Sequence, residues 1–92
     1  MGKKNQKSIV PFSINEVLFV SRIAKMCGMK TISIASYGGA TFSAVKIVKG
    51  DMSKFNLKLI KDTFQKEYNK KLFYEISECG MEKVVYLTII KE

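Results

Sequence analysis

The feature that most constrains the fold is a helix-start signal, Ser13-Ile14-Asn15-Glu16. Ser13 at the N-cap position and Glu16 three residues later form a capping box, in which each side chain accepts a hydrogen bond from the other residue's backbone N–H. Further along, Gly28 stands where helices commonly end in a left-handed residue. The sequence therefore predicts a helix from Ile14 to about Cys27.

The apolar arc of this helix is unusually wide. Its polar arc is narrow and consists of Ser21, Arg22 and Lys25. Apolar residues cover most of the rest: Val17, Phe19, Val20, Ile23, Ala24, Met26 and Cys27. Such an arc exceeds what one face of a sheet buries. Either the helix lies centrally in the fold, or part of it packs against another subunit. On the second alternative we predict a homodimer.

A second helix and a hairpin follow in the C-terminal half. Ser53 caps a helix that extends to about Asn69, with an apolar stripe opposite a polar one: Leu57, Ile60, Phe64 and Tyr68 against Lys54, Lys58, Lys61 and Gln65. The last segments, Leu72–Glu78 and Lys83–Lys91, flank the turn Cys79-Gly80 and are predicted to form two antiparallel strands.

The middle of the chain permits two interpretations. Thr31–Ser36 is rich in β-forming residues, and Tyr37-Gly38-Gly39 predicts a turn. In Ala40–Lys49 the β-branched and aromatic side chains favour a strand. The spacing of Ser43, Lys46 and Lys49 in the same segment favours a helix.

If that segment is a strand, the chain contains an internal repeat. Asn15–Lys49 and Asn56–Lys91 then each comprise a helix, a strand, a glycine turn and a strand. The order is αββαββ, which places two helices on one face of a four-stranded sheet.

If the segment is a helix, the chain follows another pattern: Asn15-x-Val17-Leu18, Gly28, Ile32-x-Ile34, Gly38-x-Ala40 and Ala44-Val45-x-x-Val48. This pattern resembles the first half of the Alba superfamily of small basic chromatin and RNA-binding proteins. The resemblance implies the order βαβαββ, with Ile9–Phe12 as the first strand. The chain departs from the family in predicting a helix over Phe55–Tyr68, where the family has a strand. Either order gives one α+β domain, a two-layer sandwich over residues 9–92, after a basic tail at residues 1–8.

The charge of the chain favours an anionic partner. Sixteen Lys and Arg oppose eight Asp and Glu, which gives a net charge of +8, and such a field attracts polyanions. Only Arg22 is an arginine, and base-reading sites favour arginine. We therefore expect contacts to backbone phosphates of DNA or RNA, largely without sequence specificity. The candidate contact residues are the following: Lys3, Lys4, Lys7, Arg22, Lys25, Lys30, Tyr37, Lys46, Lys49, Lys54, Lys58 and Lys61.

Catalysis is not expected from these residue types. The chain has no His, and Cys27 and Cys79 are too far apart in the sequence for a zinc-binding spacing. We predict no enzyme activity, metal or cofactor. The alternative function is a protein-interaction module, an accessory or inhibitor subunit that docks through the apolar helix face. With no secretory signal and no membrane-length apolar stretch, a cytoplasmic location is expected.

The capping box yields a stability prediction. Replacing Ser13 with Ala removes the N-cap oxygen and should lower the free energy of unfolding by about 1 kcal/mol. Chemical denaturation measures the change, and an unaltered midpoint would contradict the assignment of Ser13 as the N-cap.

Overall fold

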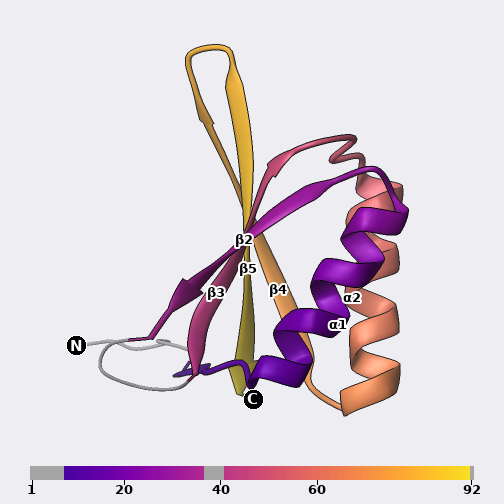
Figure 1. The fold of residues 1–92 in the computed structure, drawn as a ribbon, viewed down its shortest axis with the longest axis vertical. Coiled ribbons are helices and arrows are strands. Elements are labelled where there is room, and N and C mark those ends of the chain that lie inside the picture. The colour runs from indigo at the N-terminus through magenta and orange to yellow at the C-terminus, as the bar shows by residue number, and fades with distance from the viewer. Residues whose placement is uncertain (1–7, 37–40, 92) are drawn as a thin grey trace, which may run out of the picture.

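The computed structural model describes residues 8–36 and 41–91 of the chain. Seven elements follow one another in this order: β1 (Ser8–Val10), α1 (Ile14–Met26), β2 (Lys30–Ala35), β3 (Phe42–Lys49), α2 (Lys54–Tyr68), β4 (Lys71–Cys79) and β5 (Glu82–Lys91). The strands form one antiparallel sheet, and both helices lie on the same face of it (Figure 1). The molecule is therefore an α+β sandwich of two layers, as the sequence predicted.

The last strand, β5, organises the sheet. It pairs with β4 from Glu82 to Ile90, with β3 near its middle and with β1 at its C-terminal end. Because β2 pairs with β3, the strands run β2-β3-β5-β4 across the sheet, and β1 shares one side of β5 with β3. The β4–β5 hairpin extends past the helix layer, and the two helices run antiparallel beside each other (Figure 1).

The structure corrects two expectations about the sheet. It has five strands instead of four, because Ser8–Val10 pairs with the end of β5; Ser8 thus belongs to the sheet and not to the tail. The ambiguous segment Ala40–Lys49 is a strand from Phe42 onward, where the Alba-like order requires a helix. Val45 and Ile47 are both fully buried. A strand places such alternate residues on one face, whereas the helical spacing of Ser43, Lys46 and Lys49 would not bring Val45 and Ile47 together. The observed order is αββαββ preceded by β1.

The predicted helix ends are confirmed. Ser13 Oγ accepts a hydrogen bond from the backbone N–H of Glu16 (3.2 Å), and Glu16 Oε1 accepts one from the N–H of Ser13 (2.7 Å). Gly28 follows α1 in a left-handed conformation, with φ of +77°. Ser53 caps α2 by accepting from Asn56 N–H, and a left-handed Asn69 ends that helix. Local sequence signals therefore determine where both helices begin and end.

One glycine is required by a close approach between segments. A Cβ atom added to Gly50 would lie 2.5 Å from both the carbonyl oxygen of Gly28 and the Cα of Met29. The end of β3 therefore lies directly against the turn between α1 and β2. At φ of +120°, the backbone of Gly50 also adopts a conformation that other residues rarely reach.

The hydrophobic core fills the space between the sheet and the helices. The predicted stripe of α2 faces it: Leu57, Ile60 and Phe64 are fully buried, and Tyr68 is half-buried. The Phe64 ring lies 5.9 Å from that of Phe12 and 6.4 Å from that of Phe19, centroid to centroid. These aromatic contacts join α2 to α1 and to the segment before α1.

The wide apolar arc of α1 is covered mainly within one chain. Of the seven apolar positions named above, six are buried or half-buried, but Ile14, Leu18 and Met26 of the same helix are exposed at 53%, 53% and 80%. Phe19 packs edge-on against Tyr68 on one flank, while Ser21 accepts a hydrogen bond from Thr31 of β2 on the other. Packing within one chain thus covers most of the arc, and Ile14, Leu18 and Met26 stay exposed on its outer side.

The burial of α2 predicts a contrast between two phenylalanines. Phe64→Ala should lower the free energy of unfolding by about 3–5 kcal/mol, because it leaves a cavity at the junction of the helices. Phe55→Ala removes an identical ring from the same helix, but that ring is 76% exposed. Its effect should stay within about 0.5 kcal/mol. Equal losses in chemical denaturation would contradict the packing described.

Candidate functional site

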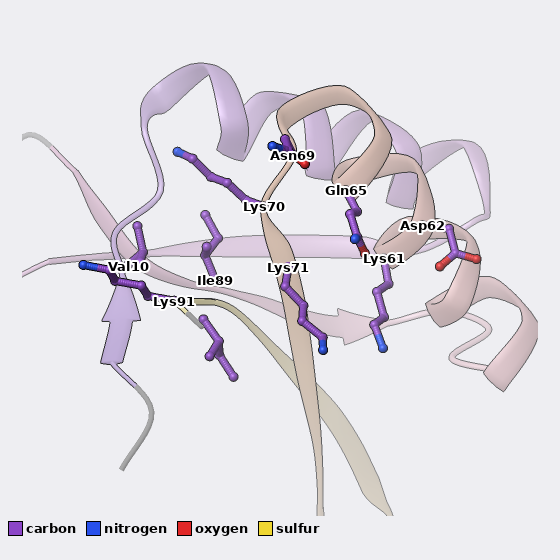
Figure 2. Close-up of a pocket in the computed structure, with 10 residues that line it drawn as sticks. Val10, Lys61, Asp62, Gln65, Asn69, Lys70, Lys71, Ile89 and Lys91 are labelled. Atoms are coloured by element: carbon purple, nitrogen blue, oxygen red, sulfur yellow. The ribbon is translucent and has the colours of Figure 1, made fainter. Parts of the chain in front are cut away.

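A groove lined by lysines lies where the C-terminal half of α2 meets the sheet (Figure 2). Its volume is about 690 Å³. Its lining comes from four elements and the α2–β4 turn: Val10, Lys61, Asp62, Gln65, Asn69, Lys70, Lys71, Ile89, Ile90 and Lys91. Four lysines and one carboxylate thus surround a single hollow, which we call the lysine groove.

The local structure explains how these lysines come together. Lys61, Gln65 and Asn69 are four residues apart and so lie on one flank of α2. The left-handed Asn69 ends the helix and sends the chain directly into β4. Lys71 then pairs with Ile90 in the hairpin register, which places it one residue from Lys91.

Consecutive lysines after α2 point in opposite directions. In Figure 2, Lys70 extends toward α1, whereas Lys71 and Lys61 extend the other way. The Nζ atom of Lys70 lies 2.5 Å from Glu16 Oε2, and the Glu16 side chain is almost completely buried. The same carboxylate completes the capping box of α1. Lys70 therefore ties the start of α1 to the wall of the groove.

Glu16 is held in its charged form. Burial of the carboxyl group raises its pKa, but the hydrogen bond and charge of Lys70 and the hydrogen bonds from Ser13 together lower the pKa by more. The net pKa lies below the ordinary value of 4.5. The ion pair is thus intact at neutral pH, and the charge of Lys70 is neutralised by Glu16.

The carboxylate at the groove is also engaged elsewhere. Asp62 Oδ2 accepts a hydrogen bond of 2.7 Å from Lys58, and this contact raises the pKa of Lys58. Within residues 8–36 and 41–91, no ion pair involves Lys61 or Lys91. These two ammonium groups can therefore bind an anion without first breaking an ion pair.

A second hollow has a different charge balance. It lies between the end of β3 and the tip of the β4–β5 hairpin, with a volume of about 810 Å³. Lys46, Lys49 and Lys83 line it together with Asp51 and Glu82. Three cations against two carboxylates make it nearly neutral, so the smaller lysine groove is the stronger candidate for an anion.

The structure does not gather the predicted contact residues into one site. Arg22 and Lys25 are exposed on α1, and Lys54 and Lys58 are exposed on α2. Lys30 and Lys49 lie opposite each other at the ends of β2 and β3. Lys46 lies on the sheet face away from the helices, with its Nζ 5.5 Å from the centroid of the Tyr86 ring. Of the predicted residues, Lys61 lines the groove; Lys3, Lys4, Lys7 and Tyr37 lie outside the described residues.

Sequence reasoning missed Lys70, Lys71 and Lys91. The position of the hairpin turn was a signal for Lys71 and Lys91. A hairpin that turns at residues 80 and 81 pairs position 71 with position 90, next to Lys91. The predicted turn at Cys79-Gly80 was one residue too early, which obscured this register. Nothing local indicates that Lys70 points to Glu16, 54 residues earlier in the chain.

Other kinds of site find little support. In the described part of the chain no group of three or more His, Cys, Asp or Glu could hold a metal ion. Neither α1 nor α2 is long and apolar enough to cross a membrane. Cys27 is a half-buried free thiol at the end of α1.

Comparison with known proteins adds no assignment: no family model, curated protein or solved structure matches the chain.

The Glu16–Lys70 pair predicts how stability depends on pH. A lowered pKa in the folded state means that ionised Glu16 stabilises the fold above pH 4.5, and that this contribution is lost as the pH falls through the folded-state value. Glu16→Gln should therefore cost about 1–2 kcal/mol at pH 7. The difference from the unaltered chain should shrink at pH 3. A cost that is equal at both pH values in chemical denaturation would contradict an ionic role.

Proposed function

We propose that the chain binds the phosphate backbone of DNA or RNA, largely without sequence specificity, through the lysine groove. The observation that carries this proposal is that Lys61, Lys71 and Lys91, besides the ion-paired Lys70, line one hollow with a single carboxylate. That carboxylate belongs to Asp62, which is already paired with Lys58. The groove therefore offers positive charge to a ligand and little competing negative charge.

The chemistry of the groove suits a phosphodiester chain. Lysine ammonium groups act as point charges toward phosphate oxygens, and neutral amides add hydrogen-bond donors. Gln65 and Asn69 provide such amides beside Lys61. Base-edge recognition would favour arginine, and Arg22 lies on α1, away from the residues that line the groove. Affinity without sequence preference follows from this composition.

The helix layer beside the groove supplies a supporting field. Arg22, Lys25, Lys54 and Lys66 are all exposed on α1 and α2. Such cations steer a polyanion toward the surface over distances of about 10 Å at 0.1 M salt. The helix layer would thus guide the approach of the nucleic acid, and the groove would bind its phosphates.

Salt dependence tests the proposal. Binding of the full chain to duplex DNA and duplex RNA should weaken linearly in log affinity against log salt, because bound phosphates release counterions. The double variant Lys61→Gln/Lys91→Gln should flatten this slope by about 1–2 for duplex DNA. Fluorescence anisotropy at several salt concentrations measures both quantities.

A matched control separates the groove from overall charge. Lys49→Gln/Lys83→Gln removes the same two charges from the nearly neutral hollow, so its slope should change by less. Equal effects of the two double variants would show that only the net charge matters. No binding of any nucleic acid at 50 mM salt would contradict the function itself.

A further inference from the structure

The face of the sheet opposite the helices carries an apolar surface that no described element covers (Figure 1). Strand alternation places Val85, Leu87 and Ile89 against the helices, so the residues between them face outward. The outward side chains are largely aliphatic and aromatic, and they include Ile9, Ile32, Ile34, Phe73, Tyr86 and Ile90. Ile9, Ile32 and Phe73 are about half exposed, at 60%, 50% and 48%. We call this surface the open sheet face.

Two opposite charges occupy symmetric places on this face. In the register of the sheet, Tyr86 of β5 lies between Lys46 of β3 and Glu75 of β4. Lys46 and Glu75 are therefore two strand spacings apart, roughly 9.6 Å. They form no ion pair with each other among the described residues. Lys46 Nζ lies over the ring of Tyr86, and both charges remain at the outward side of the sheet.

We propose that the open sheet face binds a second copy of this chain, sheet against sheet. A two-fold axis that runs along β5, midway between two stacked sheets, exchanges the β3 side of one copy with the β4 side of the other. Lys46 then faces the partner's Glu75, and the partner's Lys46 faces Glu75. Stacked sheets lie about 10 Å apart, a gap that extended Lys and Glu side chains span together. The face is thus complementary to itself in charge as well as in hydrophobicity.

The area of the face suffices for such a dimer. Four strands span roughly 19 Å, and positions 84 to 90 of β5 span roughly 24 Å, which is about 450 Å² of plane per copy. The relief of the side chains increases the accessible area, so two copies bury on the order of 1,000 Å² in total, the lower bound for a specific interface. A hollow of about 340 Å³ beside Phe73 and Tyr86 could accept side chains of the second copy.

A second copy fits this face better than a nucleic acid strand. Aromatic rings stack on bases, but this face presents more isoleucine than aromatic surface, with few cations and one opposing carboxylate at Glu75. Apolar association is also insensitive to screening, and salt reduces the repulsion between two copies of charge +8. Dimerisation is thus independent of the proposed function and should depend on salt less steeply than the binding of a polyanion does.

A charge swap tests the proposed interface. Sedimentation equilibrium of the full chain at 10–100 µM should give the mass of two chains, both at 0.1 M and at 0.5 M salt. Lys46→Glu and Glu75→Lys should each weaken the dimer about tenfold or more, because each change brings like charges together. The variant with both changes should recover most of the affinity. Circular dichroism melting checks that each variant is folded.

An apolar pair of variants tests the same face independently. Phe73→Ser should weaken the dimer, whereas Phe55→Ser, on the outer side of α2, should leave it intact. A monomer at 100 µM for the unaltered chain would overturn the proposal, as would a dimer that is indifferent to Phe73→Ser and to both charge changes. A monomer whose binding to single-stranded oligonucleotides falls with Phe73→Ser would replace it with a base-stacking surface.

Discussion

The buried carboxylate of Glu16 is the interaction on which the arrangement of the two helices depends. A lone charge in this position would be costly, so the fold must supply partners for it. The backbone N–H of Ser13 provides one and the ammonium group of Lys70 the other. The hydrogen bond from Ser13 N–H caps the first turn of α1. The ion pair with Lys70 connects that turn to the segment that follows α2. The start of α1 and one wall of the lysine groove are therefore connected through this one group.

The two surfaces of the molecule differ because a strand has a period of two and a helix does not. From Val84 to Ile90 of β5, the odd-numbered residues join the core under the helices and the even-numbered residues form the open sheet face. The helices turn their lysines outward on the opposite side, beside the groove. A dimer formed through the open sheet face would leave both helix layers on its outside and would border both grooves, because Ile90 and its β4 partner Lys71 line the groove and also lie on the outward side of the sheet. Such a dimer presents two phosphate-binding sites to one polyanion, and linked sites gain affinity from their effective concentration.

The candidate site was predicted only in part, and the reason is its long range. The lysine stripe of α2 was evident from sequence spacing, and Lys61 does line the groove. Its other members come from β4, β5 and the turn before β4, which are brought together by the hairpin register and by a contact across 54 residues. Conversely, the charges on α1 and at the ends of β2 and β3 contribute to the overall charge but not to the groove. Counting cations along a chain cannot distinguish these two groups, because only the sheet order decides which strands are neighbours.

By itself, the sequence determined the local events of folding in this chain. Capping oxygens at Ser13 and Ser53, a left-handed Gly28 and the apolar stripe from Leu57 to Tyr68 act over one to four residues, so they can be read directly from spacing. The tertiary structure decided what spacing leaves open: that Phe42–Lys49 is a strand, that Ser8–Val10 joins β5, and that Lys70 turns to Glu16. The physical reason is that β-branched segments are compatible with either helix or strand until a neighbouring strand supplies their hydrogen bonds. Charged side chains, likewise, acquire partners only when distant segments meet.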